Sequence, residues 1–229
     1  MSRNEQKAVP PTDRSWIARA WYEFVRLTTF VLFTATGGFR AGGRHHIPRS
    51  GGALLVSNHQ SHLDSFVVGI PIPRPLEFVA RSTLFVPIVG PFIRSLGGFP
   101  IQREGMGASG VKETLRRLRD GRIVLLFPEG TRSPDGRLGE LKPGIAVLAQ
   151  KARVPVVPAA IAGTFEALPR SRAIPVPHPI FIQFGPPILP DDIAGLPAED
   201  VAHLIRDGIQ SCHVEARRRL ASISGGEPI

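Results

Sequence analysis

The sequence predicts an α/β fold: a single domain with one mostly parallel central sheet flanked by helices, preceded by an N-terminal amphipathic helix. Short, continuous apolar runs such as "ALLVS" and "RIVLLF" are typical of strands buried on both faces. Segments with helical spacing separate these runs, which is the alternation expected of parallel βαβ units. With 229 residues, 42% of them hydrophobic, the chain is long enough for one well-buried domain. The single cysteine, Cys212, excludes an intrachain disulfide and fits a reducing compartment.

The order of the elements follows from these patterns. We expect strands at 53–57, 76–80, 98–102, 122–127, 154–161 and 179–184. We expect helices at 62–70, 84–95, 107–120, 143–152 and 197–221. The stretch "RAGGRHHIPRSGG" (40–52) is expected to be a linker. The predicted regions are therefore an N-terminal tail and helix at 1–44, the main domain at 45–222 and a C-terminal tail at 223–229.

Residues 15–39 form the predicted N-terminal helix, with Ser15 as its N-cap and a pair of glycines at its end. Aromatic and aliphatic residues recur there at helical spacing, with arginines between them. Only 13 residues separate Arg26 from Arg40, which is too few to span a bilayer. We expect a helix that lies in a membrane interface. Packing of this helix on the chain's own domain is the alternative.

The charge balance indicates an anionic partner. The chain has 28 Lys and Arg against 19 Asp and Glu, a net charge of +9, which favours nucleic acid, an acidic membrane surface or a phosphorylated ligand. Basic residues outnumber acidic ones in residues 1–50 and flank the apolar helix. Aromatic residues make up only 7%, and no zinc-finger, RNP or helix-turn-helix signature is present. We therefore expect no nucleic-acid partner.

Polar side chains follow three of the predicted strands. Asn58, His59 and Asp64 come after the first strand, Arg103 ends the third, and "PEGTR" (128–132) follows the fourth. In open α/β sheets, ligands bind beyond the carboxyl ends of the strands. We therefore expect these side chains to share one edge of the sheet.

The stretch "SNHQSHLD" (57–64) leaves three interpretations open. His59 and His62 lie three residues apart, but the local sequence supplies no third ligand for a metal ion. His59 could be a base oriented by Asp64, if His59 lies in the strand-to-helix turn and Asp64 in the first helical turn. Otherwise Asp64 caps the helix and the histidines are polar turn residues. No serine or cysteine lies in a G-x-S-x-G elbow, so the catalytic reading is direct: His59 deprotonates a substrate hydroxyl, which attacks an activated acyl group.

The stretch "FPEGTRS" (127–133) favours an anion-binding turn. Gly130 allows a tight turn whose backbone N–H groups can bond anionic oxygens. Thr131 supplies a hydroxyl, and Arg132 a guanidinium suited to phosphate. Glu129 could bind a hydroxyl or orient a neighbouring base. The further cations expected at this site are Arg103 and Lys142.

Together these blocks resemble the glycerolipid acyltransferase family, of the lysophosphatidic acid acyltransferase type (1-acyl-sn-glycerol-3-phosphate acyltransferases). Four blocks of that family follow one another in this chain, at 58–64 (N-H-x4-D), 98–103, 127–133 and 154–161. The similarity runs from about residue 45 to residue 190. It implies the glycerol-3-phosphate acyltransferase-like α/β fold, with the acyltransferase domain at 45–222.

The resemblance implies roles for individual residues. His59 would be the general base and Asp64 its orienting partner. The ligands of the acceptor phosphate would be Arg103, Glu129, Gly130, Thr131 and Arg132. Two positions depart from the family's pattern. Arg81 stands where many members have lysine, and Pro100 interrupts an apolar strand end, which makes that strand a candidate edge strand.

The resemblance also implies the reaction. A fatty acyl group would move from acyl-CoA or acyl carrier protein to the free hydroxyl of 1-acyl-glycerol-3-phosphate, giving phosphatidic acid for phospholipid biosynthesis, with no metal or cofactor. The protein would work at the cytoplasmic face of the cell membrane, as a peripheral or monotopic protein. Two alternatives remain: another lysolipid acceptor, such as a lyso-ornithine lipid or a glycolipid, or a non-catalytic phospholipid binder at a membrane surface. The intact His59–Asp64 pair argues against a mere binder.

Overall fold

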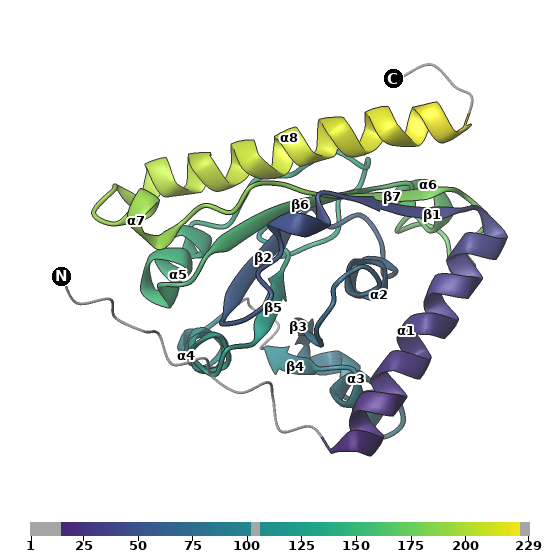
Figure 1. Ribbon diagram of the computed structural model, residues 1–229, viewed down its shortest axis with the longest axis horizontal. Coiled ribbons are helices and arrows are strands. Elements are labelled where there is room, and N and C mark those ends of the chain that lie inside the picture. The colour runs from purple at the N-terminus through teal and green to yellow at the C-terminus, as the bar shows by residue number, and fades with distance from the viewer. Residues whose placement is uncertain (1–14, 102–105, 225–229) are drawn as a thin grey trace.

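The computed structural model describes residues 15–101 and 106–224. Within them, seven strands form one sheet with helices on both of its faces (Figure 1). The strands are β1 (Phe39–Gly42), β2 (Ala53–Ser57), β3 (Leu76–Arg81), β4 (Gly98–Ile101), β5 (Ile123–Leu126), β6 (Val156–Ala162) and β7 (Ile180–Phe184). The helices are α1 (Trp16–Thr36), α2 (Asp64–Gly69), α3 (Val89–Ser95), α4 (Ala108–Arg119), α5 (Gly144–Ala152), α6 (Thr164–Ala167), α7 (Pro190–Ile193) and α8 (Ala198–Ser224). Two 3₁₀ turns are η1 (Arg44–His46) and η2 (Ser82–Leu84).

The sheet has the strand order β1-β7-β6-β2-β5-β3-β4. Every neighbouring pair is parallel except β6 and β7, so the predicted mostly parallel sheet is confirmed. The central strand β2 is buried along its whole length and pairs with β5 and β6. β4 forms an edge of the sheet, as its Pro100 predicts, because proline lacks the N–H that an interior strand would donate.

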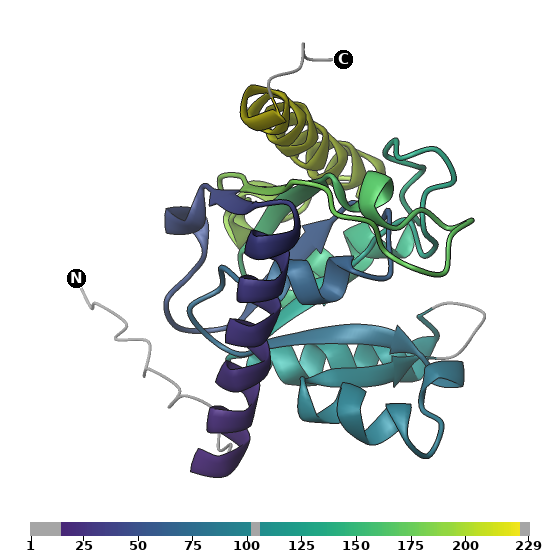
Figure 2. The same cartoon turned by 90° about the vertical axis from the view of Figure 1, so that its right-hand side faces the viewer.

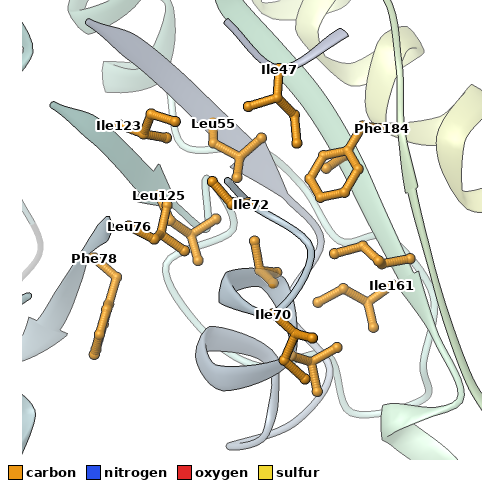
Figure 3. Close-up of a cluster of buried hydrophobic side chains, with 14 of the residues drawn as sticks. Ile47, Leu55, Ile70, Ile72, Leu76, Phe78, Ile123, Leu125, Ile161 and Phe184 are labelled. Carbon is orange, nitrogen blue, oxygen red and sulfur yellow. The ribbon is translucent and has the colours of Figure 1, made fainter. Parts of the chain in front are cut away.

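Two apolar layers hold the helices to the sheet, because successive residues of a strand point to opposite faces. Leu55 of β2 belongs to the layer that includes Val67 of α2, and Figure 3 shows part of this cluster. Its neighbour Leu54 belongs to the opposite layer, with Leu118 of α4 and Val201 of α8. Side chains of α1, α2 and α3 thus lie on one face, and those of α4, α5 and α8 on the other.

The N-terminal helix α1 is held at one side and uncovered at the other. Ser15 caps it by accepting a hydrogen bond from the backbone N–H of residue 18 at 3.3 Å, as predicted. Tyr22 is buried, and its hydroxyl accepts a hydrogen bond from the Leu76 N–H at 3.0 Å. Trp16 and Phe24 are 77% and 61% exposed. Figure 2 shows α1 running along one side of the molecule. Within residues 15–101 and 106–224, no helix combines the length and hydropathy of a membrane span.

Two expectations about the elements are wrong. The expected linker at 40–52 contains most of β1, which pairs with β7 from Phe39 onward, and it also contains η1. The sequence of β1, FRAG, contains an arginine and a glycine and lacks the apolar run by which the other strands were recognised. The helix expected at 84–95 begins only at Val89, because Pro87 disfavours helical geometry in the residue before it. The short helices α6 and α7 were not predicted either.

Candidate active site

Two of the predicted blocks meet at the centre of the sheet. β2 ends at Ser57, and the chain turns through 58–63 before α2 begins at Asp64. We call 58–63 the catalytic turn. The next strand in the sheet, β5, runs parallel to β2 and leads into 127–133 at the same edge. This carboxyl-end edge is where α/β sheets bind their ligands.

His59 and Asp64 form the centre of the site. His59 Nδ1 lies 2.8 Å from Asp64 Oδ2, and this oxygen also accepts hydrogen bonds from the backbone N–H groups of Gln60 (2.6 Å) and Ser61 (2.8 Å). The Asp64 side chain is fully buried, whereas 21% of the His59 side chain is exposed. The predicted contact is confirmed, with His59 in the turn and Asp64 in the first helical turn. Asp64 also binds the backbone of the turn, so one carboxylate both contacts the imidazole and stabilises the turn.

The tautomer of His59 follows from its partner. An ionised carboxylate can only accept hydrogen bonds, so His59 Nδ1 carries a proton, and in the neutral ring Nε2 has the free lone pair. The imidazole stacks on Phe127, with ring centroids 4.0 Å apart and 12° between the planes. Ring stacking on one side and a carboxylate at Nδ1 limit the rotation of the imidazole. Nε2 is therefore the nitrogen available to take a proton.

Asn58 anchors the catalytic turn to β6. Its side-chain NH₂ donates to the Ile161 carbonyl at 3.0 Å, and its Oδ1 accepts from the Ile161 N–H at 2.8 Å. Both residues are fully buried. A primary amide offers a donor and an acceptor side by side, which aspartate and leucine do not. Asparagine therefore suits this position next to the base.

Glu129 and Ser133 connect the catalytic turn to the loop after β5. The His59 N–H donates to Glu129 Oε1 at 2.7 Å, and the Ser133 N–H donates to the His59 carbonyl at 2.7 Å. Glu129 Oε2 accepts from the Gly139 N–H at 2.9 Å. Glu129 is only 4% exposed, and this burial raises the pKa of its carboxyl group. Both of its oxygens are thus engaged by backbone amides.

The remaining residues of the second block form an exposed turn. Gly130 has a φ of 69°, the left-handed region that favours glycine, which confirms the predicted tight turn. Its N–H donates to the Phe127 carbonyl at 3.0 Å, so this amide is used within the turn. Thr131 is exposed, as is Lys142, whose side chain lies against Gly130. Thr131 and Lys142 are therefore both accessible at this turn.

Cationic groups share the surroundings of the dyad. The pKa of the Arg132 guanidinium is lowered by burial and by the positive charges of Arg170 and Arg81, while Asp64 raises it. Burial lowers the pKa of His62, and the charge of Arg132 lowers it further. Repulsion among these cations would be relieved by a bound anion. The cluster of Arg81, Arg132 and Arg170, here called the arginine cluster, therefore suits a phosphate group.

Some site residues lie outside the motifs or outside the described residues. Arg103 is not among the residues that the structure describes, and its role stays a prediction. Arg170 lies after β6, outside every motif block, so no local signal could have found it. In the described parts of the chain, no three His, Cys, Asp or Glu side chains are grouped so that they could hold a metal ion.

A partly exposed imidazole, a buried carboxylate on one of its nitrogens and a neighbouring arginine cluster form a candidate site with the groups needed to activate a hydroxyl beside an anionic group. The model of the family described as Acyltransferase matches residues 38–162, more than half of the chain. This chain belongs to that acyltransferase family.

Similar proteins of known name indicate which members of the family this chain resembles. A "1-acyl-sn-glycerol-3-phosphate acyltransferase" of Bacillus subtilis is 31% identical over 144 residues, which cover 62% of this chain and 71% of the relative. A chloroplastic protein of the same name from Arabidopsis thaliana, LPAT1, is 38% identical over 51% of this chain, but the match spans only 33% of that relative. The crystal structure of the "1-acyl-sn-glycerophosphate (LPA) acyltransferase, PlsC" from Thermotoga maritima superposes with a TM-score of 0.70. It is 26% identical and covers 85% of this chain and 80% of that one.

Proposed function

We propose that this acyltransferase moves a fatty acyl group from an acyl thioester to the free hydroxyl of 1-acyl-glycerol-3-phosphate, giving phosphatidic acid. The observation that carries the proposal is the His59–Asp64 dyad beside the arginine cluster. The dyad can activate a hydroxyl, and the arginines can hold the phosphate of the same acceptor. The names of the relatives support this acceptor. The donor is acyl-CoA or acyl carrier protein.

The reaction begins when the acceptor hydroxyl lies against His59 Nε2. The imidazole takes the hydroxyl proton as the oxygen attacks the thioester carbonyl, and Asp64 stabilises the imidazolium that forms. The tetrahedral intermediate then collapses, the carbon–sulfur bond breaks, and the thiolate takes the proton from His59. Ester and free thiol are the products, and His59 returns to its starting state. General-base catalysis of this kind contributes roughly 10²–10⁴-fold to the rate.

Glu129 acts in this proposal as a positioning residue. Its two carboxylate oxygens bind the His59 and Gly139 amides, so it joins the catalytic turn to the loop that carries Arg132. A buried carboxylate would also repel a phosphate at close range. The phosphate is therefore assigned to Arg132, with Arg81 and Arg170 beside it. Thr131, Lys142 and the predicted Arg103 complete the proposed acceptor site.

The apolar face of α1 supports a location at a membrane surface. Large side chains are exposed along that face: Trp16, Ile17, Trp21, Phe24, Leu27, Phe30, Val31 and Leu32. A second exposed apolar stretch covers 84–92, where Ile88 is 86% exposed. The two are joined at α3, because the Trp21 indole N–H donates to Ser95 Oγ at 2.9 Å. An apolar surface of this extent with arginines nearby fits an anionic bilayer, here the cytoplasmic face of the cell membrane.

The first test is turnover with defined substrates. Purified protein in detergent or vesicles would be mixed with palmitoyl-CoA and 1-oleoyl-lysophosphatidic acid, and free thiol and phosphatidic acid would be measured. We expect equal amounts of both products. The His59→Ala variant should lose at least about 10²-fold in rate. The control is His203→Ala, because His203 is exposed on α8.

A panel of donors and acceptors separates the alternatives. Acyl carrier protein would replace CoA, and a lyso-ornithine lipid or lysophosphatidylcholine would replace lysophosphatidic acid. A higher kcat/KM with another lysolipid would identify that lipid as the acceptor, and the proposed acyl-transfer mechanism would stand unchanged. Thioester cleavage with no acylated lipid, or full activity in His59→Ala, would refute the proposed reaction.

A further inference from the structure

A buried polar contact joins the last helix of the fold to the catalytic turn. Gln60, the residue after the base, is fully buried, and its amide nitrogen lies 3.3 Å from His213 Nε2. His213 lies on α8, 153 positions further along the chain, and is 7% exposed. No motif includes His213, and the mechanism above does not use it. The contact is therefore unexplained by acyl transfer alone.

Hydrogen-bond geometry determines how this contact is made. The same Gln60 nitrogen donates to the Gly136 carbonyl at 2.5 Å, which identifies it as the NH₂ end of the amide. An NH₂ group has two protons, so the second can point to His213 Nε2. That nitrogen must then accept, which places the His213 proton on Nδ1 and leaves the ring neutral. A doubly protonated ring would set two donors against each other.

The surroundings of His213 favour this neutral form. Burial lowers its pKa first, and the positive charge of Arg217 on α8 lowers it further, while Glu166 on α6 raises it. Arg217 and Glu166 face each other at 3.5 Å, so their charges largely offset. His213 thus fits a buried, neutral hydrogen-bond acceptor. Its Nε2 contacts Gln60, whose side chain lies in the protein interior behind the catalytic turn.

We propose that His213 is a positioning residue for acyl transfer: it accepts a hydrogen bond from Gln60 and so holds the turn that carries His59. The side-chain amide of Gln60 then bridges α8 and the loop at Gly136, while its backbone N–H donates to Asp64 Oδ2. Without the acceptor at 213, one proton of the buried amide would lose its partner, and Gln60 would shift to find another. The base next to it would move with the turn. This inference rests on the proposed use of His59 as the base.

The test compares two replacements of His213. His213→Leu removes the acceptor and keeps an apolar side chain, whereas His213→Gln can place an amide oxygen near the same point. We expect kcat of His213→Leu to fall about 10-fold, within the loss of roughly 10²-fold that a 1 Å misplacement can cause. KM for both substrates should change less than about two-fold, since no substrate contact is lost. His213→Gln should recover most of the rate.

Two controls connect the effect to Gln60. His203→Leu makes the same chemical change at an exposed site of the same helix and should leave kcat unchanged. In a Gln60→Leu background, His213→Leu should cost little more, because the acceptor then has no donor to hold. Unchanged kcat in folded His213→Leu, equal loss in the Gln variant, or full additivity with Gln60→Leu would overturn the proposal.

A measurement on the unmodified protein covers the case in which His213→Leu does not fold. Long-range ¹H–¹⁵N spectra of histidine-labelled protein report which ring nitrogen carries the proton, and the His213→Gln spectrum assigns the signal. We expect Nδ1–H for His213. An Nε2–H tautomer would exclude the proposed bond. This result does not depend on turnover, so it separates failure of the positioning role from failure of the proposed reaction.

Discussion

Asp64 shows how much of the site depends on one side chain. A single carboxylate oxygen accepts from the His59 ring and from the N–H groups of Gln60 and Ser61. Those amides would otherwise be unsatisfied at the buried start of a helix, which is costly. The carboxylate therefore sets both the path of the turn and the ring nitrogen of His59 that carries the proton. A substitution that keeps an acceptor oxygen but removes the negative charge of Asp64 can separate these two roles.

We predict that Asp64→Asn keeps the fold and loses most of the activity. The amide oxygen can still accept from the turn N–H groups, but the charge that stabilises the His59 imidazolium is gone. We expect kcat to fall by roughly 10²–10⁴-fold with little change in KM. Steady-state kinetics and circular dichroism would measure both. Asp207→Asn, at an exposed site on α8, is the matched control. A kcat within a factor of three of the wild type would contradict the role of Asp64.

A substitution of Arg132 tests whether this residue binds the phosphate of the acceptor. Loss of a charge-assisted hydrogen bond to phosphate costs about 1.5–3 kcal/mol, so Arg132→Ala should raise KM for lysophosphatidic acid by roughly ten-fold or more. The KM for the acyl donor should stay nearly constant. Arg119→Ala, which removes an exposed arginine from α4, serves as the control. An unchanged acceptor KM would remove Arg132 from the proposed phosphate site.

At the scale of elements, α1 is the part of the fold whose two faces differ most. Tyr22 and Arg26 attach it to the domain, the latter by donating to the Ile70 carbonyl at 2.9 Å. Its opposite face leaves several aromatic side chains uncovered. An amphipathic helix placed in this way can lie in a bilayer interface while the domain stays outside it.

We predict that the double variant Trp16→Ala/Phe24→Ala binds vesicles less tightly. Each large apolar side chain contributes about 1.5–3 kcal/mol when it leaves water, so partitioning should fall at least ten-fold. Co-sedimentation with phosphatidylcholine–phosphatidylglycerol vesicles would measure it. The matched control is Leu204→Ala/Val214→Ala, at exposed positions on α8. Equal binding of the two double variants would exclude α1 as the membrane contact.

At the scale of the whole molecule, the site is held by segments that are distant in sequence. The catalytic turn is bonded to β6 through Asn58, to the loop after β5 through His59, and to α8 through Gln60. Movement of any of these elements would shift His59. The stability of the fold and the position of the proposed base are therefore coupled.

The burial of His213 predicts a pH dependence of stability. The pKa of His213 is lowered in the folded protein, so below about pH 6.5 the unfolded chain binds a proton there that the folded chain does not. The contribution of His213 to the free energy of unfolding is thus most favourable above that pH and falls as the pH falls. His213→Gln cannot titrate, so its unfolding free energy should fall less between about pH 6.5 and 5. Urea unfolding at several pH values would measure the difference.

Comparing the unfolding curves of the wild type and His213→Gln isolates the contribution of His213. His46 and His62 also have lowered pKa values and contribute to the same pH range in both proteins. Only the difference between the two curves therefore reports the buried ring. Parallel curves would mean that His213 is no more protected from protonation in the folded state than in the unfolded one.

The sequence alone determined the class of fold, and it identified the pair of side chains that meet at the centre of the candidate site. Alternation of apolar runs with helical segments predicts a parallel sheet, because burial on both faces demands such strands. Only four residues separate His59 from Asp64, and a turn followed by a helix brings the two side chains together locally, as the sequence analysis allowed. Pro100 marked the edge strand for a similarly local reason.

The tertiary structure decided which distant groups complete that centre. The place of β2 between β5 and β6 brings Glu129, Ile161 and Ser133 to the catalytic turn, and α8 brings His213. Arg170 joins Arg132 from a loop with no motif. Hydrogen bonds and charge interactions of this kind depend on strand order and helix packing, which involve residues far apart in the chain. Local residue patterns do not record those distances, so only the folded structure could assign these partners.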